Sequence, residues 1–576
     1  MAAAVESADV SPVVAPEERA GPREPTRAAP GDRGGPGEPG GPVPPARDRA
    51  RPLARLEDPL IGWVAAAAVA VLAFALRVWR LGNPREFSFD ETYYAKDAWS
   101  MLQHGYVRDY VDGANERILE GDLTGLFQDE PSMIVHPEVG KWLIALGEQA
   151  FGFEPFGWRF ASAVAGALMV LALVRLVRRL TGSTMLGCVA GLLLCFDGMQ
   201  LVLSRLALLD VFLAMFLVLA ASCLVADREW TRARLSARLA SAAGEVPRWG
   251  PRVWFRPWLL GAGIWFGLAL GTKWSAIYPL AAFGLLVWAW DSGFRRSIGV
   301  RWPVLRSAVL DGVPAFVHLV VVAGLVYTVS WTGWLLHAGE YEEHLSQSQY
   351  TVHLDGDPWP TSVEPDAEGF VGETWQSLRS LYHYHRDVYQ FHTEDLDDST
   401  HVYASDPAGW LLLARPVGVN VESDIAPGTQ GCRAPAESTC LREVLLIGTP
   451  VLWWGGALAL AYAAVAWLGM RDWRFGFALV GAVSLWLPWE LNDDRPIFLF
   501  YASAVLPFTI VALTLIMGHL LGRARAPSSR RTIGTIVAGS FFVLVLLNFA
   551  WFWPIWTNGL LTRDEWLDRI WFSRWI

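Results

Sequence analysis

Long apolar runs of near 20 residues recur along this chain, and polar residues gather between them. Each run is long enough to cross the ~30 Å hydrocarbon core of a bilayer as a helix. The pattern predicts an all-α polytopic membrane protein with about eleven transmembrane helices. The expected spans are residues 60–80, 158–177, 184–203, 205–226, 257–272, 274–290, 309–337, 444–469, 475–489, 497–520 and 532–553.

Composition agrees with this class, since 53% of the residues are hydrophobic and 31 are tryptophan. The formal net charge of -10 conceals a strong difference between loops. Basic residues outside short membrane-flanking clusters form no domain, which argues against a nucleic-acid partner.

Arginines fix the expected orientation, because cytoplasmic loops carry an excess of Lys and Arg. Arg51 and Arg55 precede the first span, and every second loop after it is rich in arginine, most of all 227–256. The N-terminus is therefore predicted to be cytoplasmic and the C-terminus extracytoplasmic.

This orientation divides the chain into three expected parts. Residues 1–55 are rich in Pro, Gly, Ala and charge, which predicts a disordered cytoplasmic tail. Residues 56–553 form the transmembrane domain, with two long outer loops at 83–157 and 338–443, both predominantly acidic. Residues 554–576 form an extracytoplasmic tail rich in tryptophan. No signal-peptide apolar region opens the chain, so the first span is expected to be a retained signal anchor.

Polar and charged residues collect at the outer ends of the spans. Such residues are costly next to hydrocarbon and mark function by default. The group includes Asp90, Glu91, His136, Lys141, Arg159, Asp210, Lys273 and Arg495. Each has a plainer explanation: Arg159 or Lys273 could extend to the headgroups, Asp210 could pair with Arg205, and His136-Pro137 could be only a turn. The positive-inside rule, however, does not explain isolated cations on an outer surface.

The pair Asp90-Glu91, just beyond the first span, is the candidate catalytic element. The alternative is structural: Ser88-x-x-Glu91 has the spacing of a capping box, with Ser88 as N-cap and Glu91 at N3. The two interpretations are compatible, since a capped helix start is a rigid mount for a base.

A lipid phosphate would explain the outer cations. A sugar on a polyprenyl phosphate keeps its tail in the bilayer and its phosphate at headgroup depth. Arg and Lys would hold that phosphate and stabilise the charge that develops on it as it leaves. One carboxylate would then suffice as general base for an incoming hydroxyl.

The second outer loop contributes Tyr384-His385 and further aromatic residues nearby. This clustering suits sugar or peptide contacts, and equally an amphipathic helix at the interface. Cys432 and Cys440 lie in the same loop, and in an oxidising space a disulfide is the expected pairing.

The chain resembles the protein O-mannosyltransferases, in particular the actinobacterial branch that uses polyprenyl-phosphate mannose. The matching pieces are Phe89-Asp90-Glu91-Thr92-Tyr93-Tyr94, His136-Pro137-x-x-Gly140-Lys141, Phe156-Gly157-Trp158-Arg159-Phe160, Asp197-Gly198, Ser204-Arg205, Leu208-Leu209-Asp210, Gly271-Thr272-Lys273-Trp274, Tyr384-His385, Arg495 and Trp551-Phe552-Trp553-Pro554. They run in order over residues 60–576.

The resemblance implies a GT-C-type glycosyltransferase of the plasma membrane with an extracytoplasmic active site. It would move mannose, with inversion, onto Ser or Thr of proteins crossing or having crossed the membrane. It implies Asp90 as base with Glu91 as its support, although the sequence does not separate the two. Arg159 and Arg495 are implied lipid-phosphate contacts. Lys273, Asp210, His136, Lys141 and His385 complete the expected lipid-phosphate or sugar site.

The sequence departs from the family pattern in two places. Eukaryotic members carry a β-trefoil domain in a large loop, but 338–443 is too short and lacks three-fold repetition. The family more often has His-Pro-Pro where this chain has His136-Pro137-Glu138.

Two other functions fit parts of the pattern. A GT-C relative moving another lipid-linked sugar to a lipid or glycan would use the same acid pair and spans. A transporter is a second alternative, but transporters tend to have duplicated halves and midplane charges. No cofactor is required by this mechanism. A divalent metal stays open, because Asp90, Glu91 and Asp210 could supply oxygen ligands.

Overall fold

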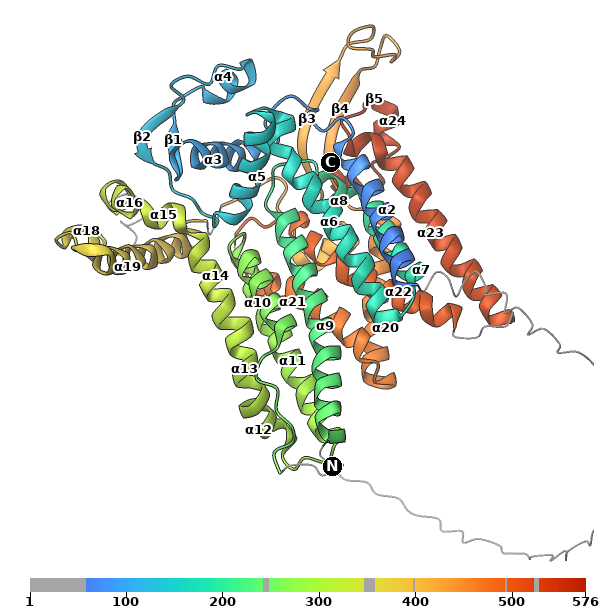
Figure 1. Ribbon diagram of the computed structural model, residues 1–576. Helices are drawn as coiled ribbons and strands as arrows, with labels where there is room; N and C mark the ends of the chain where they lie inside the picture. The colour runs from blue at the N-terminus through green and yellow to red at the C-terminus, as the bar shows by residue number, and fades with distance from the viewer. Residues whose placement is uncertain (1–57, 242–247, 347–357, 397–398, 493–494, 523–527) are drawn as a thin grey trace, which may run out of the picture. The chain divides into compact units, whose positions relative to one another are not determined.

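The computed structural model describes residues 58–241, 248–346, 358–396, 399–492, 495–522 and 528–576 (Figure 1). These residues belong to one compact unit of the chain, residues 52–576. The tail expected at 1–55 lies outside the described residues. The described part is mostly helical, as expected for a polytopic membrane protein.

Within the described residues, six helices are long and apolar enough to cross a membrane. They are α2 (Pro59–Val78), α6 (Pro155–Thr181), α9 (Asp210–Ser241), the continuous helix Pro303–Ser330 that ends in α14 (Val322–Ser330), α20 (Pro450–Met470) and α23 (Ser529–Trp556). Shorter helices in the remaining predicted spans are α7 (Thr184–Cys195), α10 (Pro257–Leu270), α11 (Ile277–Ser297), α21 (Trp473–Trp486) and α22 (Leu506–Leu521). Each predicted span thus contains a helix. The count of transmembrane helices and the sides of the two termini stay predictions.

Several helices begin at proline, whose fixed φ and missing N–H suit the first helical position. In α2, Pro59 follows the N-cap Asp58, whose carboxylate accepts the N–H of Leu60 at 2.8 Å. α6, α10 and α20 also begin at proline. The predicted starts at 60, 158 and 257 lie close to the observed ones, whereas α20 begins at 450 and its predicted span begins at 444.

The third predicted span, 184–203, is not one helix. It divides into α7 and α8 (Gly198–Leu203), because the carboxylate of Asp197 accepts the N–H groups of Gln200 and Thr449 and so caps a new start. Asp197 also accepts from the Trp453 indole at 2.8 Å. Asp197, part of the Asp197-Gly198 motif quoted above, is thus a fully buried helix cap.

The all-α prediction is wrong in detail, because the structure contains two small antiparallel sheets. β1 (Arg108–Tyr110) pairs with β2 (Phe127–Pro131). β3 (Val417–Ile425), β4 (Cys440–Leu446) and β5 (Leu560–Thr562) form the other, in that order, with Val417 opposite Leu446 and Cys440 opposite Thr562. The apolar half of β4 was assigned to the span 444–469, since a short apolar run does not distinguish strand from helix. The sheet ties the C-terminal residues to the second long loop.

Cys432 and Cys440, the pair that the sequence predicts, form a disulfide in the hairpin between β3 and β4.

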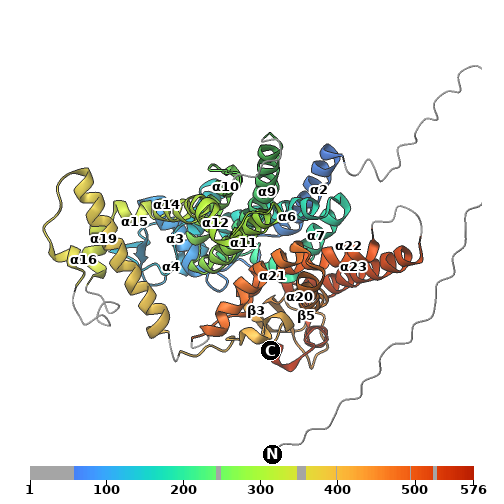
Figure 2. The ribbon, with the colours of Figure 1, turned by 90° about the horizontal axis from the view of Figure 1, so that it is seen from below.

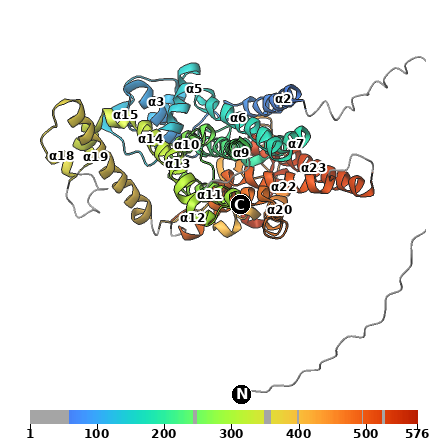
Figure 3. The same ribbon diagram turned by 60° about the horizontal axis from the view of Figure 1, so that its bottom comes forward.

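The bundle has two unlike ends (Figure 1). One, here called the long-loop end, carries α3 (Glu91–His104), α4 (Ala114–Glu120), α5 (Val139–Phe151), α15 (Thr332–Leu336), α16 (Ala338–Leu345), α18 (Pro360–Val363), α19 (Gly369–Gln390) and both sheets. α16 and α19 lie to one side of the bundle and α22 and α23 to the other (Figures 2 and 3). The opposite end, here called the arginine-rich end, carries the loop that joins α9 to α10.

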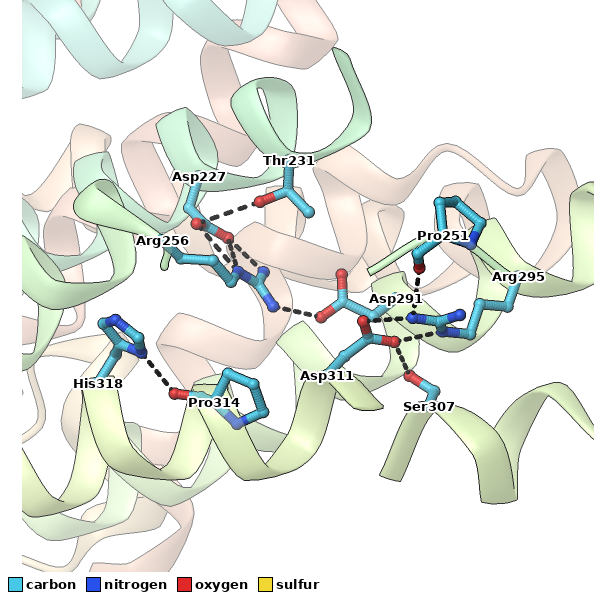
Figure 4. Close-up of polar contacts among 10 residues, drawn as sticks. All are labelled: Asp227, Thr231, Pro251, Arg256, Asp291, Arg295, Ser307, Asp311, Pro314 and His318. Carbon is cyan, nitrogen blue, oxygen red and sulfur yellow. Dashed lines mark hydrogen bonds and ion pairs between the residues drawn. The ribbon is translucent and has the colours of Figure 1, made fainter. Parts of the chain in front are cut away.

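A buried network of charges lies toward the arginine-rich end, and is called here the inner cluster: Asp227, Arg256, Asp291, Arg295 and Asp311 (Figure 4). Arg256, just before α10, donates from Nε to Asp227 of α9 at 3.1 Å and from Nη1 to Asp291 of α11 at 2.7 Å. Arg295 of α11 donates to Asp311 at 2.5 and 2.7 Å. The network joins three helices to the helix Pro303–Ser330.

Candidate active site

Asp90 lies at the start of α3, at the long-loop end, as its N-cap residue. It is partly buried, and burial, opposed by Lys273 and aided by Asp210, raises its pKa to about 6. A carboxylate with such a pKa is ionised at neutral pH and accepts a proton more readily than an ordinary aspartate.

The residue before it is held in an unusual backbone conformation. Phe89 has a φ of 54°, in the left-handed region that non-glycine residues rarely adopt. Its ring meets the rings of His401, Phe498 and Phe500 edge-on, at centroid distances of 6.4, 5.8 and 5.9 Å. These contacts fix the main chain from which the Asp90 side chain projects.

The predicted capping box is only half formed. α3 begins at Glu91, two residues later than a Ser88 N-cap requires, and no side chain accepts a hydrogen bond at its N-cap. The Ser88 N–H nevertheless donates to Glu91 Oε2 at 2.9 Å. Glu91 therefore supports the turn, but Ser88 is not the N-cap.

Glu91 and Arg159 form a sealed pair with both side chains at 0% exposure. Arg159 Nη2 lies 2.6 Å from Glu91 Oε2, and Nε lies 2.8 Å from Oε1. Glu91 also accepts the Ala207 N–H at 2.9 Å. The remaining Arg159 donors bind the carbonyl oxygens of Pro84 and Glu86, at 2.8 and 2.9 Å. This arrangement leaves Arg159 no donor for a lipid phosphate, so its position suits bracing of the loop that leads to Asp90.

Asp210 and Lys273 lie beside Asp90. Lys273 Nζ is 3.0 and 2.9 Å from the two carboxylate oxygens of Asp210, and 5.0 Å from the ring centroid of Tyr501. Burial is the largest influence and opposes the charge of Lys273, but Asp210, Tyr501 and Asp90 together outweigh it, so the pKa of Lys273 is raised. The tight turn between α10 and α11 thus holds a cation next to the candidate base.

A cavity of about 520 Å³ opens at this point. Its polar lining includes His136, Asp210, Lys273, His392 and Arg495. The rest is largely aromatic or apolar and includes Trp274, Tyr278, Tyr327, Leu485, Trp489 and Tyr501. Charged groups and a long apolar wall in one cavity suit an amphiphilic ligand.

Of the two cations that line this cavity, Arg495 makes fewer hydrogen bonds and ion pairs than Lys273. Its Nη1 donates to Nδ1 of His392 at 2.9 Å, and within the described ranges no carboxylate forms an ion pair with it. The other His392 nitrogen, Nε2, faces the Val135 carbonyl at 3.3 Å and therefore carries the proton. Burial and Arg495 lower the pKa of His392 to about 4, so His392 orients Arg495 without neutralising it.

His136 stacks on His392 with ring centroids 5.8 Å apart. Burial and Lys273 hold the pKa of His136 well below its usual range, so the imidazole is neutral. It lines the cavity as a polar, uncharged wall.

His385 lies behind the cavity wall. Its Nδ1 faces the Leu381 carbonyl at 2.7 Å, which leaves Nε2 to accept from the Tyr327 hydroxyl at 2.5 Å. Tyr327 in turn accepts the Trp274 indole N–H at 2.7 Å. His385 therefore positions two residues that line the cavity.

Lys141 does not line the cavity. It is 1% exposed and its Nζ lies 2.8 Å from Asp97, which joins α5 to α3. The structure thus brings Asp90, Asp210, Lys273, Arg495 and His136 together, and places Glu91, Arg159, Lys141 and His385 in supporting positions.

Glu138, where the family more often has proline, is buried at the start of α5. It accepts the Trp334 N–H at 3.1 Å and the Trp142 indole at 3.3 Å, and burial raises its pKa to about 7. It joins α5 to α15 outside the cavity.

Sequence reasoning did not select His392, Trp274, Tyr327 or Tyr501 as site residues. Trp274 belongs to the Gly271-Thr272-Lys273-Trp274 motif quoted above. The roles of His392 and Trp274, however, depend on contacts between segments distant in sequence. Within the described residues, no group of three or more His, Cys, Asp or Glu side chains could hold a metal ion.

Comparison with known proteins agrees with the resemblance. Residues 67–332 match the family described as dolichyl-phosphate-mannose-protein mannosyltransferase, and 377–575 match the C-terminal four-transmembrane region of protein-O-mannosyltransferase. A polyprenol-phosphate-mannose–protein mannosyltransferase of Mycolicibacterium smegmatis (strain MKD8) is 35% identical over 525 residues, covering 90% of this chain and 94% of the relative. The chain belongs to the protein mannosyltransferase family.

A second relative with the same name, from Corynebacterium glutamicum, is 32% identical and covers 88% of this chain and 92% of its own. The fold is shared with the solved S. cerevisiae protein O-mannosyltransferase Pmt1-Pmt2 complex bound to the sugar donor. That match has a TM-score of 0.63 at 15% identity and covers 91% of this chain and 94% of the other. The protein is thus a membrane-embedded enzyme of the GT-C glycosyltransferase architecture.

Proposed function

We propose that this protein mannosyltransferase transfers mannose from polyprenyl-phosphate mannose to Ser and Thr hydroxyls of proteins, at the outer face of the plasma membrane. The observation that carries the proposal is the meeting of a carboxylate of raised pKa with two cations beside one amphiphilic cavity. The relatives' names supply the sugar, the lipid carrier and the protein acceptor.

The proposed mechanism uses only these side chains. Asp90 takes the proton of the acceptor hydroxyl as its oxygen attacks the anomeric carbon of mannose. The bond from that carbon to the phosphate oxygen breaks, and the electron pair leaves with polyprenyl phosphate. Attack opposite the leaving group inverts the anomeric centre.

Arg495 and Lys273 hold the phosphate in this mechanism. Charge grows on the phosphate as the bond breaks, and fixed cations in a cavity of low dielectric stabilise it without reorganisation. Arg495 has donors free of carboxylate partners in the described residues, so it would make the closer contact. Lys273 shares its charge with Asp210 and would act over a longer range.

The apolar side of the cavity, which includes Tyr278 and Leu485, would contact the first prenyl units of the lipid. Glu91 and Arg159 would act through structure, by holding the loop from which Asp90 projects. The outer-face assignment follows from the arginine-rich loops at the other end of the bundle.

The test is transfer of label from radiolabelled polyprenyl-phosphate mannose to a Ser/Thr-rich peptide by the purified protein in lipid nanodiscs. Asp90→Asn should reduce kcat by about 10²- to 10⁴-fold, the range for loss of a general base. Asp112→Asn, an exposed aspartate of the same loop, is the matched control and should keep normal turnover.

Two outcomes would contradict the proposal. Near-normal turnover of folded Asp90→Asn would remove the base. Label that reaches only lipid or glycan, with the wild-type protein and an excess of peptide, would favour a transferase with another acceptor.

A further inference from the structure

A second cavity, of about 400 Å³, lies apart from the candidate active site and shares no lining residue with it. Three segments distant in sequence form it: residues 80–86 after α2, the β3–β4 hairpin, and residues 558–560 before β5. We call it the Arg80 cavity. Its lining is almost entirely polar: Arg80, Arg85, Glu86, Asn83, Asn420, Glu422, Arg442 and Asn558, with Pro84, Gly559 and Leu560.

The charges of this cavity are not balanced internally. Glu86 accepts the Asn420 side-chain N–H at 2.6 Å, and Glu422 accepts from Gln430 at 2.6 Å and from Arg442 at 3.0 Å. Both carboxylates are therefore satisfied by donors other than Arg80 and Arg85. Those two arginines form no ion pair and no side-chain hydrogen bond with any residue that the structure describes.

Contacts of the loop's main chain explain why the Arg80 and Arg85 side chains face the cavity. Its carbonyl oxygens are bound from inside by buried guanidinium groups: Arg159 binds Pro84 and Glu86, and Arg205 binds the Trp79 carbonyl at 2.6 Å. With its main chain fixed this way, the loop presents the Arg80 and Arg85 side chains to the cavity.

Asn558 adds a second signal. It is 9% exposed, its φ is 56°, and its side-chain oxygen has no hydrogen-bond partner. A buried acceptor without a donor costs free energy unless a ligand or water supplies one. Arg80 lies over the Trp79 ring at 5.5 Å, a contact that leaves its charge without a counter-charge. The cavity thus offers two cations without a carboxylate partner and an acceptor without a donor among the described residues.

The cavity begins at headgroup depth. α2 ends at Val78, and the ring of the next residue, Trp79, lies 5.4 Å from Trp553 of α23. Tryptophans at the ends of apolar helices mark the membrane interface. Arg80 follows directly, at the level where lipid phosphates lie.

We propose that the Arg80 cavity binds a phosphate group that carries free hydroxyls, the chemistry of a polyol-phosphate headgroup. Arg80 and Arg85 bind the phosphate oxygens, and Asn558 accepts from a hydroxyl. An outer-leaflet lipid and a soluble polyol phosphate share this chemistry, and the position at the interface favours the lipid. The site does not depend on the transfer reaction, so the two proposals can fail separately.

Native mass spectrometry of the full chain, titrated with phosphatidylglycerol or phosphatidylcholine, tests the cation contacts. Wild type should retain one phosphatidylglycerol in preference to phosphatidylcholine. Arg80→Gln/Arg85→Gln should weaken that retention by about tenfold or more, since each basic residue near a lipid phosphate contributes about fivefold. The control Arg433→Gln/Arg563→Gln removes two exposed arginines elsewhere in the same sheet region and should bind as wild type does.

Two further probes test the rest of the assignment. Phosphatidylmethanol has the same charge but no hydroxyl, and should be retained several-fold less well. Glycerol phosphate in solution distinguishes the source: displacement of phosphatidylglycerol at millimolar concentration would support a soluble ligand, and no displacement would support the lipid. Equal retention by the double variant and wild type would overturn the site, and equal retention of phosphatidylmethanol would overturn the hydroxyl contact.

Discussion

The inner cluster and the candidate active site both contain buried arginines and aspartates, but their arginines differ in whether a carboxylate neutralises them. In the inner cluster Arg256 and Arg295 are surrounded by carboxylates: Asp227 and Asp291 for one, Asp311 for the other. None of the five residues lines either of the two cavities described above. In the active site Arg495 faces a neutral histidine and an open space.

The difference teaches that a buried charge in a membrane protein does not by itself mark a functional site. Charges that satisfy one another hold helices together, while a cation lacking its counter-charge next to a cavity is prepared for a ligand. Glu91 and Arg159, although at the long-loop end, belong to the first kind. Their sealed geometry places them with Arg256 and Asp227 rather than with Arg495.

The largest effect expected from this comparison is on stability. Arg256→Gln leaves Asp227 and Asp291 buried without their cation, and breaking a buried pair in this way costs about 3–5 kcal/mol. The thermal midpoint in nanodiscs should fall by several degrees, while turnover per folded molecule stays within about twofold of wild type. A selective loss of turnover at unchanged stability would show that the inner cluster takes part in the reaction.

Arg495→Gln should give the reverse result. Loss of one charge-assisted contact to the donor phosphate, worth about 1.5–3 kcal/mol, should raise the donor KM or lower kcat/KM by about 10- to 100-fold. The thermal midpoint should change little, because Arg495 has no carboxylate partner among the described residues. Arg415→Gln, at the same end but outside the cavity, serves as the comparison variant. A large loss of stability with unchanged kinetics would show that Arg495 stabilises the fold and does not bind the donor phosphate.

The pH dependence of transfer tests Asp90 without a substitution. A base must be deprotonated, and the pKa of Asp90 is raised to about 6. Transfer should therefore be full above about pH 7 and fall as pH decreases through 6, by about tenfold at pH 5. The measurement is kcat/KM against pH, in which the acid limb reports the free enzyme. A limb centred near 4 would exclude a carboxyl group with this raised pKa as the base.

The smallest expected effect is at the edge of the inner cluster. Thr231 Oγ1 donates to Asp227 at 3.4 Å, a long contact. Thr231→Val should cost about 1 kcal/mol or less, against the larger loss for Arg256→Gln, and should leave transfer unchanged. Equal thermal shifts for the two variants would mean that charge pairing is not what stabilises this region.

The sequence predicts features that depend on local hydropathy and misses those that depend on distant partners. Each of the eleven predicted spans contains a helix, since apolar length is a local signal. The transmembrane count and the catalytic role of the acid pair at 90–91 stay predictions. Arg159 and Arg495 look alike in the sequence, because only the fold brings Glu91 to one and His392 to the other. The apolar end of β4 was assigned to a helix, because it runs on into the apolar α20 and a short apolar run does not distinguish strand from helix.

The backbone at Phe89 has one more consequence. A left-handed conformation at a phenylalanine costs about 1–2 kcal/mol, and here it is tolerated because three aromatic rings from far along the chain surround the side chain. Those rings do not line the active-site cavity, yet they determine where the Asp90 side chain points. Substitutions at 401, 498 or 500 would therefore displace the Asp90 carboxylate, even if every residue that lines the cavity stayed the same.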